Sequence, residues 1–145
     1  MHLLDVNVLI ALCDADHVNH DVALSWFRAN QHAGWATCPL TENAVLRVIG
    51  HHAYPGGPGS PEAVRPLLSH LAQLPGHEFW ADAISFRDAG LFADLGTATS
   101  KQLTDIYLLA LAVHRHAKLA TFDQRVAPDL VLGGAEALRV IPPNA

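Results

Sequence analysis

Residues 2–13 read His-Leu-Leu-Asp-Val-Asn-Val-Leu-Ile-Ala-Leu-Cys, and this stretch decides the fold. Its first part, residues 2–5, predicts a short apolar strand, and residues 8–13 predict a helix that follows almost at once. Asp5 closes the strand between apolar neighbours, where a carboxylate is costly to bury unless a partner or a metal ion meets its charge. Asp5 is therefore the first candidate for a functional residue.

Strand and helix patterns continue to alternate along the rest of the chain. Strands are expected at residues 35–38, 78–80, 118–121 and 139–141. Helices are expected at residues 21–30, at 41–49 with Thr41 as N-cap, at 61–74, and at 85–95 with Ser85 as cap. Thr104 is expected to cap one more helix, which is apolar on most of its circumference. Alternating strands and helices predict an α/β fold in one domain, residues 1–145, with a central, mostly parallel sheet and helices on both faces.

Composition limits the classes of function. With 145 residues and 50% hydrophobic content, the chain can bury about two-thirds of its unfolded surface in one core. Nine Lys and Arg against fourteen Asp and Glu give a net charge of -5, which argues against binding nucleic acid through a broad basic surface. Any affinity for nucleic acid must be local or assisted by a metal ion.

The two cysteines, Cys13 and Cys38, are too few for a disulfide framework and have neither zinc nor redox spacing. A reducing, cytoplasmic setting fits this content. The apolar stretch at residues 3–12 is interrupted by Asp5 and Asn7 and has no basic region or cleavage site, so no signal peptide is expected. No apolar run is long enough for a membrane span, and no membrane contact is predicted.

Four acidic residues lie where an open α/β sheet binds its ligands, near the carboxyl ends of strands. Asp5 closes the first strand and Asp123 follows the strand at 118–121, while Glu42 and Asp105 stand in the first turns of helices. If they converge, their charges raise one another's pKa, and a divalent cation removes that conflict. Oxygen ligands of this kind suit Mg²⁺ or Mn²⁺, which can polarise a phosphodiester and activate a bound water. The pattern predicts metal-dependent phosphodiester hydrolysis.

Taken singly, these acids also have structural explanations. Glu42 and Asp105 would each stabilise the positive end of a helix dipole by roughly 0.3–1 kcal/mol. Asp123 could belong to an ordinary Asp turn. Spacing alone leaves both interpretations open.

Four segments in order resemble the PIN-domain nucleases, and more narrowly the VapC-type toxins of bacterial toxin-antitoxin pairs. They are Leu-Asp-Val-Asn-Val-Leu-Ile at 4–10, Thr-Glu-Asn with Leu-Arg behind it at 41–47, Leu-Thr-Asp-Ile-Tyr-Leu-Leu-Ala at 103–110, and Ala-Thr-Phe-Asp at 120–123. The resemblance implies a PIN-like three-layer α/β/α sandwich. It also implies a Mg²⁺-dependent endoribonuclease, with Mn²⁺ as a substitute, that acts as the toxin of a type II toxin-antitoxin module.

The family's catalytic and metal-binding acids carry over onto four residues of this sequence: Asp5, Glu42, Asp105 and Asp123. Asp5 and Asp105 look like the principal metal ligands, and the other two would complete the cluster or act through water. Asn7 and Thr121 match polar positions that support such sites, although a capping or turn role explains each equally well. The resemblance further implies an RNA substrate, a homodimer, and a cognate VapB-type antitoxin that blocks the active-site groove.

Three cations and one loop are candidates for contacts with substrate or partner. Arg47 lies five residues after Glu42 and could bind a phosphate or a partner carboxylate, or pair within the protein. Lys101 and Arg125 flank two acidic motifs and could steer RNA or merely solvate the surface. The loop at 51–61 resembles a proline-containing insert of a family subgroup. An ordinary surface loop is the more common explanation for it.

Three other functions compete with this one. A haloacid-dehalogenase-type phosphatase also begins with a strand that ends in Asp, but it needs a second Asp where this chain has Asn7. DNA-directed nucleases of the wider PIN class usually carry extra helices and basic surfaces. A catalytically silent PIN-like binding module would have no need to keep four mutually repelling acids.

Overall fold

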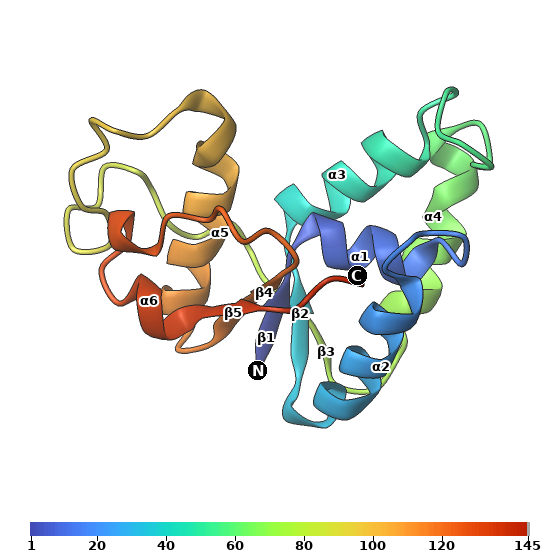
Figure 1. Ribbon diagram of the computed structural model, residues 1–145, viewed down its shortest axis with the longest axis horizontal. Helices are drawn as coiled ribbons and strands as arrows, with labels where there is room; N and C mark the ends of the chain where they lie inside the picture. The colour runs from blue at the N-terminus through green and yellow to red at the C-terminus, as the bar shows by residue number, and fades with distance from the viewer. Residues whose placement is uncertain (145) are drawn as a thin grey trace.

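Five short parallel strands form the centre of the fold in the computed structural model, which describes residues 1–144 (Figure 1). They are β1 (His2–Leu4), β2 (Trp35–Thr37), β3 (His77–Phe79), β4 (Lys118–Thr121) and β5 (Leu138–Val140). Their order across the sheet is β3-β2-β1-β4-β5, and each neighbouring pair is parallel. The predicted parallel α/β sheet is confirmed. Position 145, the end of the predicted domain, lies outside the described residues.

Helices cover both faces of the sheet and form the outer layers of an α/β/α sandwich. Figure 1 shows α1 (Val6–Cys13), α2 (His20–Asn30), α3 (Pro39–Ile49) and α4 (Pro61–Ala72) on one side, and α5 (Leu103–His114) and α6 (Gly134–Ala137) on the other. Three short 3-10 helices complete the list: η1 (Gln31–Ala33), η2 (Ser100–Gln102) and η3 (Pro128–Leu130). None of the helices within residues 1–144 has the length and apolar character to cross a membrane.

Alternating side chains of the strands build two separate cores. Leu3 and Leu119 pack into the core beneath α5, whereas Leu4 and Ala120 pack into the core beneath α1 and α2. All four side chains are fully buried. This alternation follows from the pleat of a strand, which turns successive residues to opposite faces.

The strand order creates a crevice at the carboxyl ends of β1 and β4. From β1 the chain proceeds to β2 and β3 on one side, and then crosses to β4 and β5 on the other side. Such a reversal is the topological switch point at which open α/β sheets bind ligands. The backbone N–H of Asp5 donates to the carbonyl of Ala120 at 3.0 Å. This bond keeps the two strands together up to the crevice.

The helix predicted at residues 85–95 does not form, and this segment is a series of turns. The Oδ1 atom of Asp88 accepts the backbone N–H of Gly90 at 2.8 Å, and Oγ of Ser85 accepts that of Arg87 at 3.2 Å. Side-chain acceptors of this kind compete with the helical hydrogen bonds of the backbone. Ser85 therefore caps a turn, and the predicted helix cap is wrong.

Two predicted helix N-caps are also wrong, because both helices begin earlier. Helix α3 starts at Pro39 after the N-cap Cys38, and Oγ1 of Thr41 accepts the backbone N–H of Cys38 at 3.0 Å from inside the first turn. Helix α5 starts at Leu103, directly after η2, so Thr104 is its second residue. Pro39 suits the first helical position, which needs no N–H donor.

Candidate metal centre

Asp5 is a deeply buried carboxylate, 4% exposed, directly after the carboxyl end of β1. It caps α1, where its Oδ1 accepts the backbone N–H of Val6 at 2.7 Å. Its Oδ2 accepts Oγ1–H of Thr121 at 2.7 Å and Nδ2–H of Asn7 at 3.2 Å. Burial raises the pKa of Asp5, and the hydrogen bond from Thr121 opposes that rise. The side chain is thus fixed in place, and its desolvation destabilises the ionised form of the carboxylate.

Asn7 and Thr121 tie the start of α1 to the end of β4. Nδ2 of Asn7 donates to Oγ1 of Thr121 at 3.0 Å, and Oδ1 of Asn7 accepts the backbone N–H of Phe122 at 3.1 Å. Oγ1 of Thr121 also accepts the backbone N–H of Asp123 at 3.0 Å. Both side chains therefore touch the residues next to the crevice, as their predicted supporting role requires.

Asp105 and Asp123 lie within electrostatic reach of Asp5. Asp105, in the first turn of α5, is half-buried, and its pKa is raised to about 6 by burial and by the charges of Asp5 and Asp123. Arg125 holds the pKa of Asp123 below its ordinary value, since its Nε donates to Oδ1 of Asp123 at 3.1 Å. The fold has therefore brought three of the four predicted acids within range of one another's charges.

An open cavity of about 260 Å³ lies against Asp105 and Asp123. Its lining also includes Lys101 and Arg125, which brings two cations beside two of the acids. Lys101 forms no salt bridge with any residue between 1 and 144, whereas Arg125 is paired with Asp123. A phosphate-bearing substrate in this cavity would find a free ammonium group next to the aspartates.

Glu42 makes its contacts apart from the three aspartates. Its Oε1 accepts Oγ1–H of Thr37 at 2.7 Å, and the same Thr37 oxygen lies 2.8 Å from Nε2 of His77. The acidic charges that raise the pKa of Asp105 are those of Asp5 and Asp123, without a contribution from Glu42.

Two residues of this group were not predicted from the sequence: Thr37, which donates to Glu42, and His77, which contacts Thr37. Thr37 ends β2 and is 1% exposed. Its position at the carboxyl end of a strand was the signal that could have identified it. Arg47, five residues after Glu42, is exposed and forms no ion pair within residues 1–144. The internal ion pair considered for Arg47 is therefore not part of the described structure.

The donor set fits a hard divalent cation held partly by water. Within residues 1–144, no three His, Cys, Asp or Glu side chains are close enough to hold a metal ion by themselves. Mg²⁺ usually keeps several waters and binds through one or two carboxylates, so a closed cage is not required. The raised pKa values of Asp5 and Asp105 record a burial and repulsion cost that a bound cation would offset.

Comparison with known proteins identifies the class to which this fold and site belong. The PIN domain family matches residues 2–128, a range that contains all four predicted acids, and the chain belongs to this family. Ribonuclease VapC44 of Mycobacterium tuberculosis (strain ATCC 25618 / H37Rv) is 40% identical over 134 residues, which cover 92% of this chain and 94% of that protein.

Two further relatives come from the same strain. Ribonuclease VapC29 is 41% identical over 125 residues, 86% of this chain and 87% of its own length. Ribonuclease VapC38 is 42% identical over 127 residues, 87% of each chain. The predicted resemblance to PIN-domain proteins of the VapC type is confirmed.

Proposed function

We propose that this chain is the toxin of a type II toxin-antitoxin module and a Mg²⁺-dependent endoribonuclease that hydrolyses RNA phosphodiester bonds. The observation that carries the proposal is the group of buried Asp5 and half-buried Asp105 and Asp123 at the crevice. The charge of Asp123 raises the pKa of both Asp5 and Asp105. Membership of the PIN domain family and relatives named ribonucleases over most of the chain support the same function.

Asp5 and Asp105 are the proposed ligands of Mg²⁺, or of Mn²⁺ in its place, and Asp123 acts through a water. A cation there would polarise the scissile phosphodiester and lower the pKa of a bound water. Thr121 and Asn7 hold Asp5 in one orientation through bonds of 2.7 and 3.2 Å. The carboxylate is thus placed before any ligand arrives, and less reorganisation is needed.

Glu42 is proposed to complete the cluster through water or substrate. Thr37 orients its carboxylate, and Glu42 lines a cavity of about 390 Å³ between α3 and α4. Lys101 and Arg125 would contact phosphates beside Asp105 and Asp123, because both line the same cavity as these acids. Arg47, exposed and unpaired within residues 1–144, remains a candidate for a phosphate or a partner carboxylate.

The partners proposed for this chain are RNA, a VapB-type antitoxin and a second copy of the chain, in the cytoplasm. The cavity lined by Glu42 is also lined by Phe79, whose side chain is 57% exposed. An antitoxin that covered Phe79 would also close access to Glu42. The homodimer and the single domain over residues 1–145 are carried forward from the family resemblance and the sequence pattern.

The first test is cleavage of total bacterial RNA by the purified protein with Mg²⁺ or Mn²⁺. Discrete fragments are expected with metal, and no fragments with EDTA or with Asp5→Asn. Asp129→Asn is the matched control, since Asp129 is exposed and does not line the crevice. Cleavage that survived in Asp5→Asn would refute the site. Folded protein that left RNA intact with every metal would favour the catalytically silent binding module, and cleavage of DNA alone would favour a DNA-directed nuclease.

A further inference from the structure

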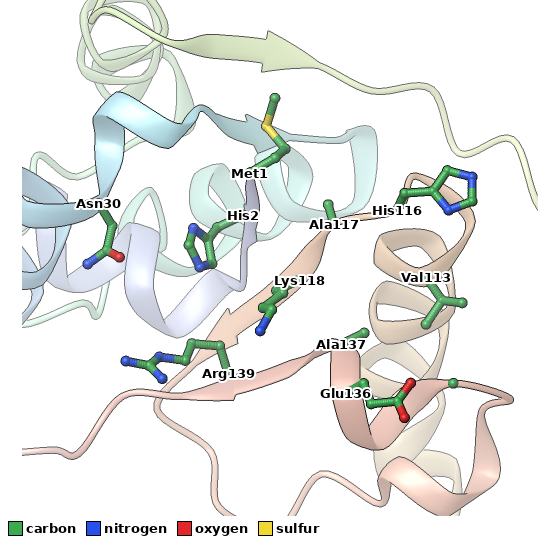
Figure 2. Close-up of a pocket in the computed structure, with 11 residues that line it drawn as sticks. Met1, His2, Asn30, Val113, His116, Ala117, Lys118, Glu136, Ala137 and Arg139 are labelled. Carbon is green, nitrogen blue, oxygen red and sulfur yellow. The ribbon is translucent and has the colours of Figure 1, made fainter.

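A larger cavity, of about 510 Å³, lies at the opposite edge of the sheet, where the strands begin (Figure 2). Its lining includes His2 of β1, Lys118 of β4, Arg139 of β5 and Asn30 at the end of α2. Figure 2 shows the head groups of these four residues gathered on one side of the cavity. Four separate segments therefore bring nitrogen-bearing side chains to one place.

The register of the sheet explains why the basic side chains share a face. His2 pairs with Lys118, and Ala120, two residues further along β4, pairs with Arg139. Paired residues of parallel strands point to the same face, as do residues two apart on one strand. On this face Ala120 is fully buried in the core beneath α1 and α2, whereas Lys118 and Arg139 are exposed. At the amino end of this face, Trp26 of α2 packs against His2, and the helices leave Lys118 and Arg139 exposed.

Neither Lys118 nor Arg139 forms a salt bridge with any residue between 1 and 144. Glu136 lines the same cavity, but it belongs to α6, which packs with α5 over the other face of the sheet. Two positive charges on neighbouring strands repel each other when they are close. The pKa of His2 is lowered to about 4, first by burial and then by positive charges that include Arg139 and Lys118. The Nδ1 atom of His2 is buried without a hydrogen-bond partner in the described structure.

We propose that this cavity binds a phosphate group, with Lys118 and Arg139 as its charged contacts and Asn30 as a polar one. The guanidinium group of arginine offers a planar fork of N–H donors that matches phosphate, and lysine adds a mobile point charge. Two of the nine Lys and Arg residues of a chain with net charge -5 lie on this one surface. A bound anion would be attracted by both charges.

Two kinds of ligand would bring a phosphate group to this cavity: an RNA strand, or a small molecule such as a mononucleotide. A strand rises about 3.3 Å per residue, so Lys118 and Thr121 at the two ends of β4 are about 10 Å apart. An RNA of a few nucleotides is long enough to reach from the carboxyl end of β4 to this cavity. The RNA source rests on the proposed function, whereas binding of a phosphate group does not.

The first experiment titrates inorganic phosphate and adenosine monophosphate into the isotope-labelled full chain, in EDTA at constant ionic strength, and follows the imidazole resonances of His2 by NMR. A saturable shift is expected in the wild type and in the charge-preserving variant Lys118→Arg/Arg139→Lys. The shift should be lost in Lys118→Gln/Arg139→Gln and kept in Arg87→Gln, an exposed site outside the cavity. No saturable shift in the wild type, or an unchanged shift in the double glutamine variant, would overturn the proposal.

A second measurement distinguishes the two sources of phosphate. Binding of a fluorescent RNA oligonucleotide is measured in EDTA at several salt concentrations. If RNA is the source, the double glutamine variant should bind about fivefold more weakly or worse, and its salt slope should fall by about 1.4, as for two lost phosphate contacts on a single strand. Unchanged RNA affinity beside a lost phosphate titration would support a small phosphate ligand. Both measurements exclude metal, so a failure of the proposed nuclease activity would not alter them.

Discussion

Replacement of Thr121 by valine tests how the crevice holds Asp5. Oγ1 of Thr121 donates to Oδ2 of Asp5 at 2.7 Å and accepts Nδ2–H of Asn7 and the backbone N–H of Asp123, both at 3.0 Å. Thr121 is fully buried. Valine has nearly the same shape without the hydroxyl, so Thr121→Val removes three hydrogen bonds and leaves no cavity.

The expected loss in the free energy of unfolding is about 2–3 kcal/mol at pH 7, since a hydrogen bond to a charged group contributes about 1.5–3 kcal/mol. Asn7 still donates a hydrogen bond to Asp5, which limits the loss of stability. The bond from Thr121 lowers the pKa of Asp5, so its loss raises that pKa further. A carboxyl with a folded-state pKa above its unfolded value loses stability as the pH rises between the two. The effect of Thr121→Val should therefore be larger at pH 7 than at pH 4.

Urea unfolding in EDTA at both pH values measures this effect. Thr121→Ser is the matched control, because it keeps the hydroxyl and loses only a methyl group, at a cost of about 1 kcal/mol that does not depend on pH. Equal stability of Thr121→Val and Thr121→Ser at pH 7 would contradict a stabilising hydrogen bond from Thr121 to Asp5. An equal effect of valine at pH 4 and pH 7 would refute the assigned role of the Asp5 charge.

Three further predictions concern other parts of the chain. Tyr54→Phe removes the 2.5 Å hydrogen bond to Oδ2 of Asp14 and should cost about 1 kcal/mol in urea unfolding at pH 7. Since that bond lowers the pKa of Asp14, the difference should vanish as the pH falls below the ordinary Asp range. His2→Gln should flatten the rise of melting temperature between pH 4 and 6.5, where the unfolded chain binds a proton at His2 and the folded chain does not; an unchanged profile would contradict the burial of a neutral imidazole. Thr37→Val should lower RNA cleavage by about 10-fold or more through loss of its bond to Glu42, with Thr37→Ser retaining activity.

The hydrophobic pattern and the chemistry of individual residues agree at the positions that were predicted correctly. Asp5 was expected at the end of an apolar strand, and it caps the helix that follows β1. Asp105 was expected in the first turn of a helix buried on several sides, and seven residues of α5 are buried. Both predictions depend only on neighbours within one turn or one strand, and such local information is present in the sequence.

Predictions failed where tertiary contacts or local side-chain bonds decide the structure. The pattern at residues 85–95 is compatible with a helix, but the side chain of Asp88 accepts the backbone N–H of Gly90 and stabilises a turn instead. The link from Glu42 through Thr37 to His77 depends on the β2–β3 register, which pairs Trp35 with His77 and so puts Thr37 and His77 on one face. That register joins residues about forty positions apart, and no periodicity in the sequence specifies it.

The positions of charged residues at the two ends of the strands say more about function than the net charge of the chain does. A net charge of -5 argued against a broad basic surface. At the crevice, Lys101 and Arg125 lie beside Asp105 and Asp123, and the charges of Asp5 and Asp123 act on Asp105. Yet Lys118 and Arg139, about twenty positions apart, meet at the other edge because β4 and β5 pair in parallel. Parallel strands bring all their first residues to one edge and all their last residues to the other. An acidic chain can therefore present a cationic site to a phosphate group at one edge while the acids for a metal ion lie at the other.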